Sequence, residues 1–247
     1  HRGNTLETEA TFRARSILFF AAGIYCASAI SPNKSLIIPE NGTISLNIPL
    51  DKGRRSACST RTTHPVFLRR LQSALNSIGI QNPLENPYQL KSKKDMVDDC
   101  CQDAARKRAL VLLCSESCSC AKRSHKRYWN RRNVLHCGAC LPCIYRRVSL
   151  SGVNELRNEQ YGLDVFTPAE IQITRSDIKR NRDFKSLLYF LRNRCRREVI
   201  ETELIANGIT GKAEVEAYTD FVIHSYDQVK DWIRTNANAD IRQRAGI

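Results

Sequence analysis

The 247-residue sequence is poor in methionine, tryptophan and acidic residues, with one Met, two Trp, and 25 Asp and Glu against 39 Lys and Arg. Its single methionine is Met96, so we expect the chain to be the C-terminal part of a longer product. No Cys/His or Ser/His/Asp set for nucleophilic catalysis can be assembled from it. The 42% hydrophobic and 26% charged fractions exclude disorder, collagen and coiled coil and indicate an ordinary globular core.

The shortage of acidic residues gives a formal net charge of +14. Such a positive field attracts phosphates, nucleic acid or an acidic protein face. Eleven cysteines is an odd number, which disfavours a fully paired disulfide framework. Because most of them lie between Cys100 and Cys143, we expect a metal site in a reducing compartment, and therefore a cytoplasmic protein.

Long apolar runs are also scarce. Residues 16–30 form one that imitates a signal peptide, with arginines before it and Ala27-Ser28-Ala29 as a cleavage-like site. Glu7 and Glu9 interrupt the basic leader, and the run is shorter than the ~20 residues that a membrane-spanning helix needs. We expect a fully buried helix and no membrane partner.

The first half of the chain indicates an α/β layer, because helical and strand patterns alternate. Short apolar runs at residues 35–38 and 110–113 predict strands. Thr63 and Pro65 are typical of the start of a helix that Gly79 ends. Ser92-Lys93-Lys94-Asp95 is a capping box for a further helix to about Arg106.

The second half changes character. Beyond residue 148 only helical patterns are seen, one ending at Asn207-Gly208 and one between Tyr218 and Ile233. We predict three parts: an α/β part at residues 1–113, a cysteine-rich zinc segment at 114–148, and an all-α C-terminal extension at 149–247.

The strongest chemical signal is Cys137-Gly138-Ala139-Cys140-Leu141-Pro142-Cys143, in which three thiols at intervals of three residues can face one ion. We predict one structural zinc ion held by Cys118, Cys137, Cys140 and Cys143. Cys120 is the substitute for Cys118, and His125 and His136 are weaker alternatives. An iron–sulfur cluster is the rival interpretation, but Arg147 stands where the fourth bacterial ferredoxin cysteine would be. We expect the scattered residues Cys26, Cys58, Cys100, Cys101 and Cys195 to fill core space.

A basic loop precedes the last zinc cysteines. It combines Tyr128 and Trp129 with six cations, Lys122, Arg123, Lys126, Arg127, Arg131 and Arg132. Cations neutralise phosphates and aromatic rings stack on bases, so the loop is a candidate nucleic-acid contact. A solvated loop that merely connects zinc ligands would look the same.

Several motifs in order resemble the QueC family of 7-cyano-7-deazaguanine synthases, which are PP-loop ATPases. Residues 12–20 look like the family's arginine-bearing loop before a buried helix. Asn86-Pro87-Tyr88 with Lys93-Lys94-Asp95 resembles its lysine-acid helix start, and the cysteine set named above is similar to its four zinc cysteines. The resemblance covers roughly residues 11–148. It implies the C-terminal part of a PP-loop (adenine nucleotide α-hydrolase-like) domain, with zinc, ATP and Mg as cofactors.

Three departures stand against the biosynthetic members. The family's Ser-Gly-Gly-x-Asp-Ser loop is absent, Cys118 lies 19 residues before Cys137, and 104 residues follow Cys143. The extension, together with Glu40-Asn41-Gly42 and residues 59–65, looks more like the QueC-like proteins of the Qat anti-phage defence system. The resemblance there implies adenylation of a 7-deazaguanine carboxylate for transfer to an amine.

A ligase of this kind must bind a polyphosphate and an anionic, purine-like acid. Arg15 at a helix start is a candidate ATP contact. Ser59, Thr60, Arg61 and Thr62 are candidate substrate contacts, although the hydroxyl residues could equally serve turns and caps. Two functions therefore stay open. One is an ATP-dependent C–N ligase, with a partner protein as a possible amine acceptor. The other is a zinc-organised nucleic-acid or protein binding module.

The absent phosphate loop gives a first prediction. We expect the 247-residue chain alone neither to bind ATP with useful affinity nor to release pyrophosphate, because no backbone cradle for the phosphates is present. Equilibrium dialysis with labelled ATP and a pyrophosphate-release assay measure this. Adenylate formation by the isolated chain would contradict both the expectation and the family assignment.

Overall fold

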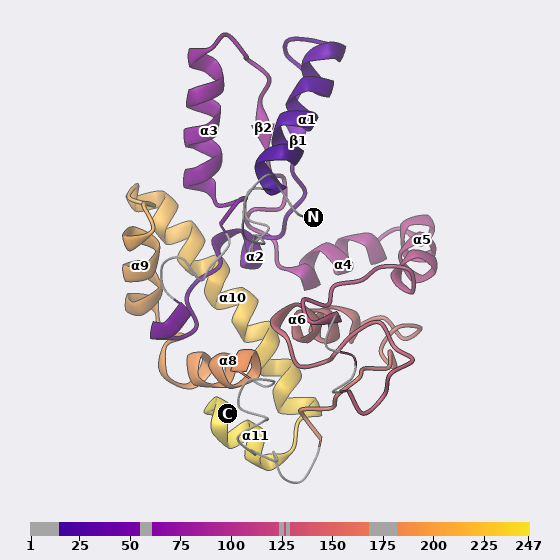
Figure 1. Ribbon diagram of the computed structural model, residues 1–247. Coiled ribbons are helices and arrows are strands. Elements are labelled where there is room, and N and C mark those ends of the chain that lie inside the picture. Colours follow the sequence, from indigo (N-terminus) through magenta and orange to yellow (C-terminus); the bar gives the residue numbers. More distant parts are fainter. Residues whose placement is uncertain (1–14, 55–60, 124–125, 127–128, 168–181) are drawn as a thin grey trace, which may run out of the picture.

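The computed structural model describes residues 15–54, 61–123, 126, 129–167 and 182–247. This part of the chain is mostly helical and contains one small sheet of two parallel strands. Figure 1 shows the strands with helices α1 and α3 at one end of the molecule. The other helices lie below them. Most are near the long helix α10 (Lys212–Asn236), whereas α4 (Lys93–Cys101) and α5 (Ala104–Cys114) extend to the right.

The α/β end is built from α1 (Arg15–Ile30), β1 (Leu36–Ile37), α3 (Pro65–Ser77) and β2 (Leu84–Glu85). β1 and β2 pair in parallel with Leu36 opposite Leu84, and α3 lies between the strands in the chain, so the unit is a β-α-β crossover. A small core joins the two helices over the strands through Phe20, Ile24, Leu68 and Leu75. The predicted strand at residues 35–38 is thereby confirmed.

Helix α1 is not fully buried, so that expectation is wrong. Five large apolar side chains on it expose between 64% and 77% of their surface: Ile17, Leu18, Phe19, Tyr25 and Ile30. Cys26 is exposed too and fills no core space. The run is apolar on all sides, but only one side of it meets α3 and the sheet.

Two local expectations at the other helices also fail. Residues 110–113 are not a strand, because Asp103 caps a new helix, α5 (Ala104–Cys114), that includes them. The N-cap of α3 is His64 rather than Thr63, and its Nδ1 accepts a hydrogen bond from the backbone N–H of Val66 at 3.3 Å. The buried His64 is thus structural, and burial together with nearby Arg61 lowers its pKa to about 4.

The capping box at Ser92 is confirmed, and it starts α4 (Lys93–Cys101). The Ser92 hydroxyl accepts from the backbone N–H of Asp95, and the Asp95 carboxylate accepts from the backbone N–H of Ser92 at 2.8 Å. The same carboxylate is within 3.1 Å of His224 and accepts from Gln228 at 2.6 Å. Both partners belong to α10 (Lys212–Asn236), so the box also ties α4 to the C-terminal helices.

The main core lies where the cysteine-rich segment meets the C-terminal helices. It packs α2 (Gly42–Leu46) and α6 (Leu141–Leu150) against α8 (Arg182–Asn193), α9 (Arg197–Ala206), α10 and α11 (Ala239–Ala245). Cys140, Cys143, Ile144, Phe184 and Ile233 are among its fully buried members. One continuous core therefore contains residues from all three of the predicted parts.

In the C-terminal region, described residues 182–247 are mostly helical, as expected, whereas residues 151–167 form turns and a loop. The first long helical pattern is split into α8 and α9 at residues 194–196. No helix in the described part of the chain is both long and apolar enough to cross a bilayer.

The Asp95 contacts predict a pH dependence of stability. Although partial burial opposes it, hydrogen bonds from Ser92, His224 and Gln228 hold the pKa of Asp95 below its usual value of 3.8. A carboxyl with a depressed folded-state pKa stabilises above its unfolded pKa, and this contribution disappears as the pH falls through the folded value. We expect Asp95→Asn to lower the free energy of unfolding at pH 7, with a difference from wild type that shrinks below about pH 5.

Urea unfolding of both proteins from pH 7 to about pH 2 measures this difference. Changes common to both proteins, such as protonation of the cysteines, cancel in it. A difference that stays constant between pH 6 and about pH 2 would contradict the role given to Asp95.

Candidate metal centre

Four thiols come together at the start of α6. The sulfurs of Cys120, Cys137, Cys140 and Cys143 all lie within 4.8 Å of one another, and the last three residues are buried. The Cys143 sulfur is 3.3 Å from that of Cys140 and 3.8 Å from that of Cys137. These four cysteines could hold one metal ion.

The local chain explains how three of the thiols converge. Gly138 has φ +84°, and a Cβ there would lie 2.3 Å from the carbonyl oxygen of Leu163, so only glycine fits this turn. Cys140 is the N-cap of α6, Pro142 stands in the first turn, and Cys143 follows on the same turn. The backbone N–H groups of Ala139 and Cys140 donate to the Cys137 sulfur, each at 3.4 Å. Such N–H groups favour a thiolate over a thiol.

The first cysteine of the set is Cys120, not Cys118 as predicted. Cys118 is exposed, and its sulfur is 3.8 Å from the carbonyl oxygen of Leu135. The Cys120 sulfur instead accepts from the backbone N–H groups of Lys122 and Cys137, both at 3.3 Å. In residues 118–120, the side chain of Cys120 points to the turn at Cys137 and Gly138, whereas that of Cys118 does not.

The geometry suits zinc. Zinc at about 2.3 Å from each of four sulfurs places those sulfurs about 3.8 Å apart. An iron–sulfur cluster puts several iron and sulfide atoms between its thiolates and therefore needs a wider ring of cysteines. With four protein ligands the ion would have no open position for water, so its role would be structural.

The pKa values of the four thiols also favour a bound cation. Hydrogen bonds with its three neighbours hold the pKa of Cys137 far below its usual range. The hydrogen bond with Cys137 raises the pKa of Cys120, but the hydrogen bonds with Cys140 and Cys143 outweigh it and lower this pKa to about 6. The same contacts raise the pKa values of Cys140 and Cys143. Four neighbouring sulfurs do not all ionise by themselves, whereas a divalent cation would offset their charges.

His136 is a support for the cluster rather than a ligand. Its Nε2 accepts from the backbone N–H of Ser119 at 3.1 Å, and its Nδ1 lies 3.5 Å from Glu159. Burial, helped by Arg146, lowers the pKa of His136. His125 lies outside the described residues.

A buried ion pair fixes the segments around the cluster. Arg146 donates through Nε to both Glu159 oxygens, at 2.9 and 2.8 Å, and through Nη2 to the carbonyl oxygen of Cys114 at 2.7 Å. The Tyr161 hydroxyl donates to Glu159 at 2.6 Å. Although burial opposes it, these bonds hold the pKa of Glu159 below its usual range. The sequence offered no local signal for this network, because its members lie on α6, the end of α5 and a later loop.

A second group of motif residues meets at the carboxyl ends of the two strands. The Asn86 side chain donates to the Glu40 carbonyl at 2.8 Å, and the Gly42 N–H donates to the Lys91 carbonyl at 2.9 Å. A Cβ on Gly42 would lie 2.2 Å from the Gln89 carbonyl oxygen, so the two loops touch here through backbone. In open α/β sheets this end of the strands is where ligands bind.

Lys93 connects this group to the thiol cluster. Its ammonium donates to the Ser119 hydroxyl at 3.1 Å, one residue before Cys120. Burial, reinforced by Arg146, lowers the pKa of Lys93. Burial raises the pKa of Glu40, although the charge of Lys93 opposes this. A partly desolvated cation and a partly desolvated carboxyl therefore interact electrostatically in this region.

The other predicted site residues are only partly described. α1 begins at Arg15, as the resemblance implies, but the Arg15 side chain lies outside the described residues, as do Ser59 and Thr60. Arg61 and Thr62 are half-buried. The Nε of Arg61 is buried with no hydrogen-bond partner among the described residues.

The basic loop exposes several cations, but it does not expose Trp129 for stacking on a nucleic-acid base. Trp129 is only 4% exposed and lies against Gly162, where a Cβ would come within 2.6 Å of its ring. It cannot stack on a base, so that part of the expectation is wrong. Lys122 pairs with Asp183 at 3.1 Å, whereas Arg123, Arg131 and Arg132 are exposed. Tyr128 and Arg127 lie outside the described residues.

Comparison with protein-family models, with curated proteins and with solved structures finds no match to this chain.

The thiol geometry predicts which cysteine matters. We expect one zinc per chain, with four sulfurs at about 2.3 Å by X-ray absorption. Cys120→Ser should weaken zinc affinity more than about 100-fold, beyond the usual cost of a change outside the ligand set, and lower the melting temperature. Cys118→Ser, two residues away, is the matched control and should keep both.

Metal analysis after competition with a chromophoric chelator measures these affinities. Bound iron with sulfide would contradict a zinc site. Loss of zinc from Cys118→Ser but not from Cys120→Ser would contradict the ligand set.

Proposed function

We propose that this chain supplies the zinc-bearing part of a QueC-like, ATP-dependent ligase. The enzyme would adenylate a 7-deazaguanine carboxylate and transfer the acyl group to an amine, in anti-phage defence in the cytoplasm. One observation carries the proposal: Glu40 and Asn86, from two motifs of the resemblance, are hydrogen-bonded at the carboxyl ends of two parallel strands, and Lys93 of the second motif interacts electrostatically with Glu40.

The reaction defines what the site must do. A carboxylate oxygen attacks the α-phosphorus of ATP and pyrophosphate leaves. The amine then attacks the acyl carbon, AMP leaves, and the amine gives up a proton. The first step brings two anions together, and at ~4 Å two unit charges repel by about 4 kcal/mol at an effective dielectric of 20. Cations beside the strand ends are needed to offset this repulsion.

Arg61 and Lys93 are candidates for those cations. The Arg61 Nε is buried and has no partner among the described residues, so it can still donate to an anion. Lys93 is desolvated, which strengthens its attraction for a carboxylate or phosphate. Glu40 interacts electrostatically with Lys93 and would limit the positive charge in the absence of substrate. Zinc would fix the segment that carries Ser119, the hydrogen-bond partner of Lys93.

The β-α-β unit also fits the larger α/β domain that such a ligase would have. Parallel strands occur almost entirely in larger sheets with helices on both faces. Here Ile37 of β1 and one side of α1 are exposed. The proposed ligase would extend this layer with the strand and loop that bind ATP and Mg, since the Ser-Gly-Gly-x-Asp-Ser motif is not in this sequence.

The alternative, a zinc-organised nucleic-acid or protein binding module, is weakened by one contact. A nucleic-acid contact by the basic loop requires aromatic rings that can stack on bases. Trp129 cannot do so because it is buried against Gly162. Several cations of the loop nevertheless remain exposed.

The ligase is tested by expressing the complete reading frame that encodes this chain and measuring ATP–pyrophosphate exchange. Exchange should depend on 7-carboxy-7-deazaguanine. We expect Arg61→Ala to reduce it by about 10- to 1,000-fold, the loss typical of one such electrostatic contact, with unchanged zinc content. Arg70→Ala, on the exposed side of α3, is the matched control and should leave exchange unchanged.

No exchange with the intact wild-type product would overturn the ligase and favour the binding module. Equal exchange in wild type and Arg61→Ala would remove Arg61 from the site.

A further inference from the structure

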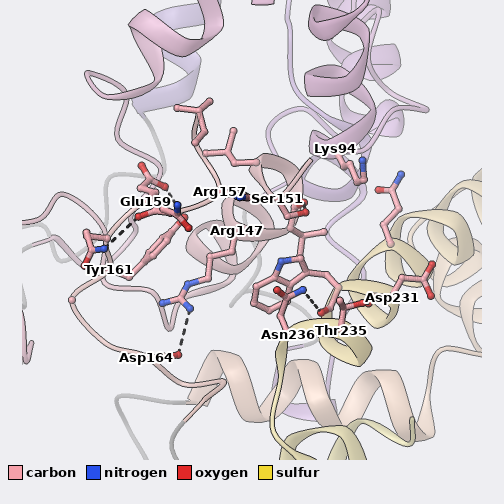
Figure 2. A pocket seen from close by; sticks show the side chains of 18 of the residues that line it. Lys94, Arg147, Ser151, Arg157, Glu159, Tyr161, Asp164, Asp231, Thr235 and Asn236 are labelled. Carbon is pink, nitrogen blue, oxygen red and sulfur yellow. Dashed lines mark hydrogen bonds and ion pairs between the residues drawn. The ribbon is translucent and has the colours of Figure 1, made fainter. Parts of the chain in front are cut away.

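A cleft of about 830 Å³ lies away from the strand ends, between α10 and the loop that follows α6. Its floor is the last turn of α6 with Ser151, one wall is residues 156–164 with Asn130 and Arg131, and the other wall is α10 around Trp232. Figure 2 shows Arg147 between Glu159 and Tyr161 on one side and Asp231, Thr235 and Asn236 on the other. Its volume is within the range of small-molecule and cofactor sites.

The cleft is held in shape by contacts already present. Its floor helix begins at the thiol cluster, and the buried pair of Arg146 and Glu159 attaches the loop wall to that helix. The Arg147 guanidinium lies 4.0 Å from the Tyr161 ring and donates to the Leu163 carbonyl at 2.9 Å. Preorganised walls reduce the ordering cost of binding.

Two of the cationic side chains that line the cleft have no acidic partner among the described residues. Glu159 is satisfied by Arg146 and Tyr161, Asp164 by Arg147 and Thr167, and Asp231 pairs with Arg234. Lys94 pairs with Asp98 at 2.7 Å. Arg131 and Arg157 line the cleft, are exposed, and have no side-chain partner among the residues that the structure describes. Two unpartnered guanidinium groups make the cleft attractive to an anion such as phosphate.

The rest of the lining is suited to a base. The side chains of Asn130 and Asn158 have no partner within the described ranges, and an amide offers both donors and acceptors, as the edge of a nucleobase does. Trp232 and Tyr161 add ring surface to the walls. An acidic peptide would use the two arginines but would have less need of the amides and rings.

We propose that this cleft binds a nucleotide, with its phosphate on Arg131 and Arg157 and its base against the amides and rings. The ligand is a free nucleotide or one residue of a single strand. This site is separate from the strand ends, so the inference does not depend on the ligase proposal.

The test uses the zinc-loaded 247-residue chain and fluorescence anisotropy with a labelled 12-nucleotide RNA at 50–200 mM salt. AMP and GMP serve as competitors. The double variant Arg131→Gln/Arg157→Gln should weaken binding at least ten-fold. It should also reduce the slope of log affinity against log salt by about 1.4, since each phosphate contact on a single strand contributes about 0.7.

Two further variants separate the cleft from general charge. Arg106→Gln/Arg108→Gln removes the same charge from exposed positions on α5 and should change affinity less than three-fold. Ser151→Phe fills the floor of the cleft without changing charge and should also weaken binding ten-fold. Melting temperature and zinc content must equal those of wild type in each variant.

Displacement of the RNA by micromolar AMP or GMP would identify a free nucleotide as the ligand, and displacement only by unlabelled strand would identify a strand. The proposal fails if neither RNA nor nucleotide binds at low salt, or if both double variants lose affinity equally. It also fails if poly-glutamate competes as well as RNA, which would indicate an acidic protein instead.

Discussion

The convergence of four thiols within 4.8 Å determines the arrangement of the cysteine-rich segment and of the helices packed on it. The sulfurs share their charge unequally, with Cys137 favouring the thiolate and Cys143 the thiol. A divalent ion would make all four ligands equivalent and close the turn before α6. Because α6 runs from this turn into the main core, the same ion would set the position of Ile144 and Val148 against the C-terminal helices.

The influence of this cluster extends further through buried polar contacts. Arg146, three residues after Cys143, binds both Glu159 and the end of α5, while Ser119, next to Cys120, accepts from Lys93 on α4. Removing one member of such a buried pair leaves an uncompensated charge, which commonly costs about 3–5 kcal/mol. The cysteine-rich segment therefore connects two regions that are distant in sequence: α4 with Lys93 and the cleft wall around Glu159.

The features that were predictable from sequence are those with short-range causes. The cysteine spacing at 137–143, the capping box at Ser92 and the strand at Leu36 each depend on a few adjacent residues. Features set by distant contacts could not be read in this way. Whether Cys118 or Cys120 joins the cluster depends on which face of the segment meets the Gly138 turn, and Trp129 is buried by Gly162, 33 residues away in the chain. Apolar residues 110–113 fit a strand equally well until Asp103 is found to cap a helix through them.

The net charge likewise could not show from sequence alone where a ligand binds. A balance of +14 attracts anions everywhere, yet many cations are committed to local carboxylates, such as Lys122 to Asp183 and Arg194 to Glu203. What distinguishes a candidate site is a cation without a partner that is also buried or lines a cleft. Exposed cations such as Arg106 and Arg108 on α5 do not meet this condition. Arg61 at its buried Nε, and Arg131 and Arg157 at the cleft, meet this criterion among the described residues. They lie in different regions, so the two proposals place anions at separate positions rather than on one basic face.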